Sequence, residues 1–463
     1  MLFRSQGLLV LLIVAVAAYV IFSRRALALA GDDIASLHSR PSYHGTFGAI
    51  CAVLPAFIVL ALWAILENSV FEARLSGLYA GHLASLTPAQ VTGFFRDAFT
   101  LSEGGAITTG TPESEAAGTV VAAMRQTSHL LLWVVLVLAV AAGTFFAWRR
   151  MAASYRARHF VERTIMVALA ASSAVAIVTT IGIVLSLIFE SFRFFSVVPL
   201  HDFLFGLHWS PQGAFVAAGA EEQVNPEVFG AIPLIAGTLF ITFIAMMVAA
   251  PVGLLAAIYL SDYAGPKMRA VAKPVLEVLA GIPTVVYGFF AALTVAPFFR
   301  GIGESVGLSV SSESALAAGV VMGIMIIPFV SSLSDDVINA VPQSLRDGSM
   351  GLGATRSETI RRVVLPAALP GIVSALILAV SRAIGETMIV VMAAGLAANL
   401  TINPLEAVTT VTVQIVTLLV GDQEFDSAKT LAAFALGLLL FCVTLTLNII
   451  ALRVVQKYRE QYD

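Results

Sequence analysis

The chain has 463 residues, of which 59% are hydrophobic and only 12% are charged, and its mean hydropathy is +0.92. A soluble domain carries about 25% charged residues, so most of this chain must face lipid or other apolar segments within a bilayer. The net charge of −3 and the lack of a basic run exclude a nucleic-acid-binding protein.

Apolar stretches long enough to cross about 30 Å of hydrocarbon occur nine times, which predicts an all-α polytopic membrane protein. In the sixth stretch, Gly281, Pro283 and Gly288 favour a kink and a close contact between helices. The nine predicted spans are 4–23, 47–66, 128–148, 162–189, 231–260, 276–299, 314–333, 367–398 and 430–455.

The basic residues orient these spans. Of the 26 Lys and Arg residues, 18 lie on one side of the predicted bundle, 7 lie on the other, and Arg382 lies within a span. The positive-inside rule makes the first side cytoplasmic, with the N-terminus outside and the C-terminus inside. Arg24 and Arg25 follow the first span without a small-residue cleavage site, which favours a retained anchor. The segments on the cytoplasmic side are 24–46, 149–163, 261–274, 334–366 and 453–463.

The basic segment RRMAASYRARHFVER, at 149–163, divides the spans into two groups. We expect an N-terminal extension, 1–150, with three spans and a periplasmic loop at 67–127. A cytoplasmic linker, 151–161, joins it to a six-span core, 162–463. The sequence has no strong internal repeat, which weakens the case for an inverted-repeat secondary transporter.

The cytoplasmic loop 334–366 has the features of a rigid protrusion. Pro342 favours a break after the preceding span, and Gly353 permits a tight turn. Leu365 and Pro366 are expected to stop the helix where the chain re-enters the bilayer. A short amphipathic helix with such a turn would fit a groove on another protein. The alternative is an ordinary loop lying on the membrane surface.

Part of this loop, DGSMGLGATRSETIRRVVLP at 347–366, resembles the cytoplasmic signature of type I ABC importer permeases, E-A-A-x3-G-x9-I-x-L-P. The opening triplet departs from that signature, although its first residue is still an acid. The resemblance implies a six-helix, MetI-like permease core and a loop that couples it to cytoplasmic ATPase subunits. The residues that occupy the signature positions are Asp347, Gly353, Val363, Leu365 and Pro366.

Arg382 and Glu386 lie near the middle of the predicted span 367–398. In a continuous helix their i,i+4 spacing would place them on one face. A charge at the bilayer centre costs about 2.5–3.5 kcal/mol on insertion scales, so the pair should face a polar pathway or a partner. An arginine suits an oxyanion because its guanidinium forms bidentate, charge-assisted hydrogen bonds. The alternative is a structural ion pair that fixes helix packing.

Several segments, in order, resemble the PstC family of phosphate ABC importer permeases: FLFGLHWSPQGAF at 203–215, VLEVLAGIPTVVYGFFAALTVAP at 275–297 and SRAIGETMIVVMAAG at 381–395. The similarity covers about 162–455. It implies a bacterial inner-membrane subunit that imports inorganic phosphate, with Arg382 and Glu386 in the substrate path. It also implies a homologous PstA-like permease, two PstB-like ATPase subunits and a periplasmic PstS-like phosphate-binding protein as partners.

The sequence contains no G-x4-G-K-[ST] phosphate-binding loop. ATP hydrolysis is therefore expected in partner subunits, and we expect no metal or other cofactor in this chain. Two alternatives stay open. One is an ABC permease for another oxyanion, such as sulfate, molybdate or phosphonate. The other is an ion-coupled secondary transporter or channel, which would need no ATPase.

Overall fold

The computed structural model describes residues 2–31, 37–105, 111–211, 226–420 and 427–458. Within these ranges the chain is helical, and its β-pairing is limited to an isolated bridge between Trp209 and Phe229. Residues 212–215 of the PstC-like segment at 203–215 lie outside the described residues. So do parts of three predicted connections: 32–36, 106–110 and 459–463.

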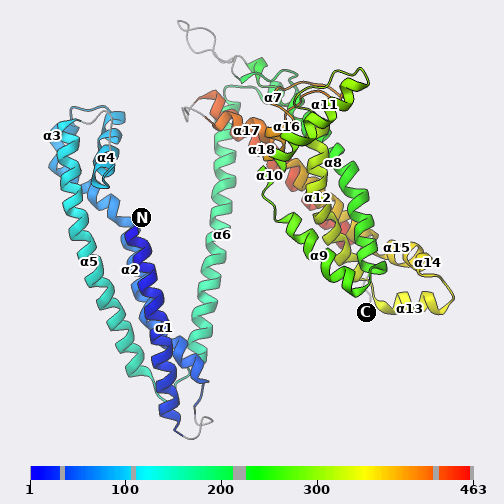
Figure 1. Cartoon of the computed structure of the whole chain (residues 1–463). Coiled ribbons are helices and arrows are strands. Elements are labelled where there is room, and N and C mark those ends of the chain that lie inside the picture. Colours follow the sequence, from blue (N-terminus) through cyan, green and yellow to red (C-terminus); the bar gives the residue numbers. More distant parts are fainter. Residues whose placement is uncertain (1, 32–36, 106–110, 212–225, 421–426, 459–463) are drawn as a thin grey trace. The chain divides into compact units, whose positions relative to one another are not determined.

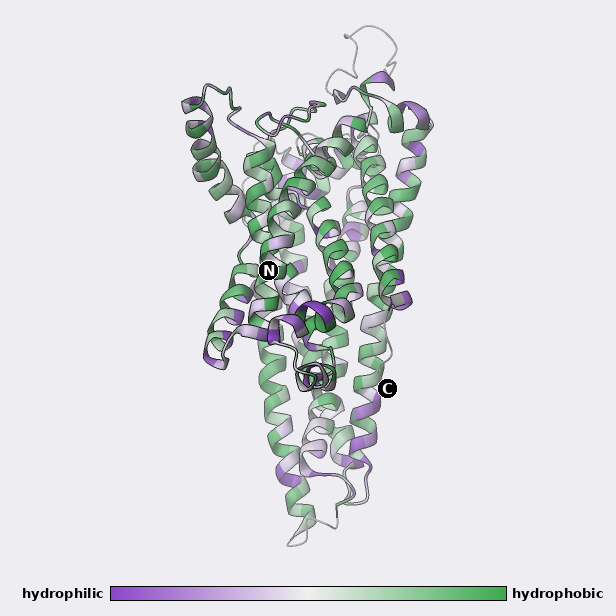
Figure 2. Ribbon diagram, turned by 90° about the vertical axis from the view of Figure 1, so that its right-hand side faces the viewer, coloured by the Kyte–Doolittle hydropathy of each residue, from purple (hydrophilic) through white to green (hydrophobic). Residues whose placement is uncertain are grey.

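Nine helices or continuous helical segments of the described residues are long and apolar enough to cross a membrane, so the predicted polytopic all-α fold is confirmed. Hydrophobic residues dominate the middle of the helices, and hydrophilic residues gather at their ends and in the connections (Figure 2). The nine spans are Gln6–Ala30, Pro41–Leu78, Pro112–Arg150, Ala157–Phe195, Ile232–Tyr263, Thr284–Ser305, Ala315–Asn339, Arg356–Ile384 and Ala428–Val454.

The chain forms two compact units, Met1–Val178 and Thr179–Asp463. The division falls inside the long helix α6 (Ala157–Phe195), which begins after the predicted linker. The predicted limits of the extension and the core, at 150 and 162, stay predictions.

The first unit is built from three long helices, α1 (Leu2–Ala30), α2 (Pro41–Leu78) and α5 (Pro112–Arg150) (Figure 1). α2 packs against both α1 and α5. At Gly143 of α5 a Cβ atom would collide with the carbonyl oxygen of Cys51 on α2, so only glycine permits this approach. Two shorter helices, α3 (Ala80–Leu83) and α4 (Pro88–Ser102), lie between α2 and α5 in the sequence, and α4 packs on α5.

The core of the second unit is the pair α8 (Ile232–Ile258) and α12 (Ala315–Asn339). Gly319 and Gly323 bring α12 close to Ile244 and Ala245 of α8, where an added Cβ would have no room. The other helical elements between α6 and α12 are α7 (Leu200–Phe205), η3 (Pro226–Val228), η4 (Tyr259–Tyr263), α9 (Pro266–Ala280), α10 (Thr284–Phe290), η5 (Ala291–Val295) and α11 (Ala296–Ser305).

After α12 the chain forms α13 (Gln343–Gly351), α14 (Arg356–Thr359), the π-helical turn η6 (Ile360–Val364) and α15 (Leu365–Ile384). It continues as α16 (Met388–Ala393), α17 (Val411–Leu419) and α18 (Ala428–Tyr458). Two predicted spans, 276–299 and 367–398, are therefore not continuous helices. The first is interrupted between α9 and α10, where the sequence predicted a kink, and the second between α15 and α16, where the expectation of an unbroken helix was wrong.

Candidate functional site

The break between α15 and α16 is the central feature of the candidate site. α15 ends at Ile384, and the backbone N–H groups of Met388 and Ile389 begin the next helix. The Glu386 carboxylate accepts hydrogen bonds from these two groups, with N···O distances of 3.1 and 3.5 Å. This local bonding satisfies donors that a helix start otherwise leaves free, so the chain can leave the helix at Gly385.

Arg382 and Glu386 consequently do not share a helical face. Arg382 lies in the last turn of α15, whereas Glu386 lies beyond its end and is bound to the start of α16. Among the described residues the structure records no ion pair between them, so the predicted i,i+4 geometry was wrong. The physical reason is that the glutamate bonds the backbone locally, which ends the regular spacing on which the prediction depended.

The guanidinium of Arg382 lies 5.3 Å from the centre of the Phe329 ring on α12. This cation–π contact stabilises the charge weakly and leaves the N–H donors of the guanidinium unused, since the described residues place no carboxylate against it. Phe329 also forms part of the wall of a cavity of about 220 Å³, together with Lys273, Ser332 and Asp335. The Phe329 ring of α12 thus lies between the guanidinium of Arg382 on α15 and a cavity lined by polar and charged groups of α9 and α12.

The second interrupted helix packs beside the first. Between α9 and α10 the Tyr287 hydroxyl donates to the carbonyl of Leu279 at 3.0 Å and so bridges the break. At Gly288 of α10, an added Cβ would lie 2.7 Å from Met392 Sδ and 3.1 Å from the Met388 carbonyl oxygen, both on α16. The kink and close contact predicted here are confirmed. Paired interruptions of this kind are typical of transporters, where freed backbone groups line a pathway.

The loop 334–366 forms the predicted helix and glycine turn. α13 begins directly after Pro342, and Gly353 adopts a φ of +91° in the turn that follows it. The hydroxyls of Ser349 and Thr359 lie 2.9 Å apart and fasten α13 to α14. Leu352 is 93% exposed at the tip of this turn, so a large apolar side chain protrudes from the loop.

The end of the signature differs from its prediction, because Leu365 and Pro366 do not stop the helix. The helical path runs without a break from Arg356 to Ile384. The Leu365 N–H donates to the carbonyl of Ile360, five residues earlier, in the π-helical turn. This wider turn makes room for the proline ring, which would clash with a carbonyl in a regular α-helix. Val363 lies half-buried within the same turn, and Asp347 accepts a hydrogen bond from Gln343.

A cluster around Asp335 was not predicted. This carboxylate is 3% exposed and accepts hydrogen bonds from Arg269 at 3.2 Å, Lys273 at 3.0 Å and Asn339 at 2.8 Å. The bond to Asp335 raises the pKa of Lys273 above its ordinary value. The cluster fixes α9 to the end of α12. One signal was available, because Arg269 and Lys273 are four residues apart on one helix face.

A second unpredicted contact holds the loop. Arg346 of α13 forms an ion pair with the buried Asp262 of η4 and donates to the carbonyl of Ile338 at 2.7 Å. These bonds join α13 to the ends of α8 and α12 from which the loop extends. A polar cleft of about 440 Å³ lies beside this contact, and Arg269 and Arg356 also line it.

Comparison with known proteins shows which family this chain resembles. Residues 249–460 match the family "Binding-protein-dependent transport system inner membrane component", and residues 8–179 match "Phosphate ATP-binding cassette transporter". The chain is 34% identical over 290 residues to the probable ABC transporter permease protein YqgH of Bacillus subtilis, covering 62% of this chain and 86% of the relative. It is 34% identical over 250 residues to the phosphate transport system permease protein PstC of Mesorhizobium japonicum, covering 50% and 75%.

A solved structure of the methionine ABC transporter MetNI, inward facing, matches with a TM-score of 0.37 and 20% identity, covering 50% of this chain and 95% of that chain. The sequence matches define the class of the protein, a multi-pass membrane subunit of an ABC transporter. Within that class, the chain belongs to the PstC family of permeases.

Proposed function

We propose that this chain is the permease subunit of an ATP-driven importer that moves inorganic phosphate from the periplasm to the cytoplasm. The observation that carries the proposal is the Arg382 guanidinium, which lies beside a helix interruption and has no carboxylate partner among the described residues. An intramembrane arginine in this setting is expensive unless it serves a polar pathway. Its planar fork matches two oxygens of a phosphate.

Glu386 has a different part in this proposal from Arg382. Its carboxylate holds the first turn of α16, and its own carbonyl accepts a hydrogen bond from the Thr412 hydroxyl at 2.9 Å. The glutamate thereby fixes the shape of the interruption next to the arginine. Because the side chain does not neutralise Arg382, the positive charge stays available to an anion. We therefore assign anion contact to Arg382 and backbone positioning to Glu386.

The cytoplasmic loop supplies the coupling step. The protrusion consists of α13, the Gly353 turn and α14. It binds a groove on one ATPase subunit, and the equivalent loop of a homologous permease binds the same groove on the second ATPase subunit. The exposed Leu352 is the apolar anchor of this contact. Closure of the ATPases on ATP moves the protrusion, and the Arg346–Asp262 ion pair transmits that movement to α8. The result is alternating access, with a periplasmic binding protein delivering phosphate at the outer mouth.

The membrane orientation follows from the same proposal. The loop that meets the ATPases must be cytoplasmic, and the distribution of Lys and Arg supports this orientation. The N-terminal helix then starts on the periplasmic side, and α18 ends in the cytoplasm. The predicted loop 67–127 is largely helical, since α2 extends to Leu78 and α5 begins at Pro112. A cysteine introduced in the connection between α3 and α4 should react with a membrane-impermeant thiol reagent in intact cells, whereas one at Leu352 should react only after the membrane is opened.

The experiment for the function is substrate uptake into vesicles that contain this chain, a sister permease, the ATPases and the binding protein. We expect uptake of labelled phosphate that depends on ATP and is unaffected by excess sulfate, molybdate or phosphonate. Uptake of one of those anions instead would replace the substrate and keep the architecture. Uptake that continues after the ATPases are omitted would identify a secondary transporter or channel.

A further inference from the structure

The first unit contains a large groove between α2 and α5. Its volume is about 1090 Å³, slightly above the usual range for small-molecule sites. The gap lies between two apolar contacts of the same helices, one around Leu60 and Leu132 and the other around Phe71 and Val121. Its apolar wall is open to the membrane, since four of its side chains are more than half exposed: Leu62, Leu66, Val70 and Leu131.

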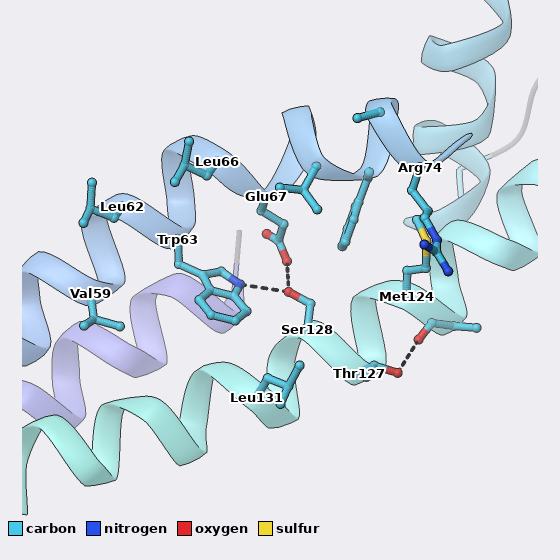
Figure 3. A pocket seen from close by; sticks show the side chains of 14 residues that line it. Val59, Leu62, Trp63, Leu66, Glu67, Arg74, Met124, Thr127, Ser128 and Leu131 are labelled. Carbon is cyan, nitrogen blue, oxygen red and sulfur yellow. Dashed lines mark hydrogen bonds between the residues drawn. The ribbon is translucent and has the colours of Figure 1, made fainter. Parts of the chain in front are cut away.

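The middle of the groove carries a hydrogen-bonded polar chain, with Val59 and Leu62 on one side of it and Arg74 and Met124 on the other (Figure 3). The Trp63 Nε1–H donates to the Ser128 hydroxyl at 2.8 Å, and that hydroxyl donates to the Glu67 carboxylate at 2.7 Å. Ser128 is itself buried, so this chain joins the two helices and aims the carboxylate into the gap. Arg74, two helical turns beyond Glu67, lies on the same face of α2 and also lines the groove.

The charges lie where a lipid headgroup lies. Glu67 directly follows the apolar run of α2, and Arg74 has no hydrogen-bond or ion-pair partner among the described residues. The lining residues of α2 extend from Val59 to Arg74, about 22 Å at 1.5 Å per residue. One leaflet with its headgroup region measures about 20–22 Å. The groove therefore matches one phospholipid in length, and its carboxylate and guanidinium are complementary to the two charges of a zwitterionic headgroup.

We infer that this groove is a binding site for a single phospholipid with an ammonium-bearing headgroup, such as phosphatidylethanolamine. The acyl chain lies along Val59, Leu62 and Leu66, and the phosphate binds the guanidinium of Arg74. The headgroup turns back from Arg74 toward the apolar stretch, so that its ammonium group donates to Glu67, whose position is held by Ser128. A choline headgroup lacks N–H donors and so loses this last contact. The inference is independent of the substrate of the second unit.

The test is native mass spectrometry of the full-length chain, purified in mild detergent and exposed to phosphatidylethanolamine or phosphatidylcholine. The wild type should retain one phosphatidylethanolamine and less phosphatidylcholine. Arg74→Gln should weaken retention of both about tenfold, and Glu67→Gln should remove the preference between them. The matched control is Arg96→Gln on α4, whose side chain is 77% exposed and lies outside the groove.

A groove-filling variant, Val70→Trp, gives a second measurement that does not depend on charge. It should displace the acyl chain and abolish retention while the thermal unfolding midpoint stays within a few degrees of wild type. Equal retention by Arg74→Gln and Arg96→Gln would overturn the inference. So would photo-crosslinking from Leu66 that captures a protein helix and no lipid, because the groove would then be a subunit contact.

Discussion

The carboxylate of Glu386 accepts a hydrogen bond from the backbone N–H of Met388, and this bond starts α16 at the point where the chain has left α15. The Glu386 side chain binds the first turn of α16 from outside the helix, next to the N-cap residue Thr387, and the ring of Phe329 is the cation–π partner of Arg382. Substitutions of the two residues should therefore have different effects on transport and stability.

Glu386→Gln should leave uptake within about threefold of wild type, because the amide oxygen still accepts the two N–H bonds. Glu386→Ala removes the acceptor and should lower stability by about 0.5–2 kcal/mol, the usual cost of a lost cap. Transport rate and thermal unfolding of both variants check this. If Gln were as damaging as Ala, the negative charge itself would be essential, and the capping account would fail.

Gly353→Ala should uncouple ATP hydrolysis from transport. The substitution meets no neighbouring atom, so its effect comes from the φ of +91° alone. Such a backbone costs a non-glycine residue about 1–2 kcal/mol, which lowers the population of the native turn by a factor of about 5–30. The measurement is phosphate imported per ATP hydrolysed.

The control for Gly353 is Gly351→Ala, two residues earlier. Gly351 ends α13 without a positive φ and also has open space around it. We expect this variant to couple normally. Equal coupling in the two variants would show that the geometry of the turn is not required.

Asp335→Asn should destabilise the second unit by about 1–3 kcal/mol, since it leaves Arg269 and Lys273 without their shared counter-charge. Both cations are partly exposed, so water offsets part of the larger penalty of a fully buried pair. Asp336→Asn, with its side chain 66% exposed, should change stability by less than about 0.5 kcal/mol. Chemical or thermal unfolding measures the stability of the two variants in parallel. Equal stability would contradict a structural role for Asp335.

The sequence was sufficient for the number and type of spans, because hydrocarbon thickness sets a minimum length of apolar helix. It also predicted the Gly353 turn, since a tight turn at that spacing requires glycine. The break at Gly385 was missed because a count of apolar residues does not register that a carboxylate satisfies the backbone of the next helix. The prediction that Pro366 stops the helix was wrong for a related reason, since a π-helical turn accommodates a proline that would end an α-helix.

The sequence also failed to predict polar contacts between residues far apart in the chain. Arg269 and Asp335 are 66 residues apart, and Arg346 and Asp262 are 84 apart. Neither pair has a local spacing that predicts it, so only the packing of α8, α9 and α12 brings the groups together. In the first unit the chain from Trp63 through Ser128 to Glu67 spans a similar separation. Residues of this kind are found only once the helices are placed.

The most direct test of the central claim is phosphate uptake by the assembled transporter carrying Arg382→Gln, compared with Arg453→Gln at the exposed end of α18. We predict that the first variant assembles and hydrolyses ATP but loses uptake by at least about tenfold, the loss expected for one charge-assisted contact. The second variant should transport as the wild type does. Normal phosphate uptake by a fully assembled Arg382→Gln transporter would contradict the account.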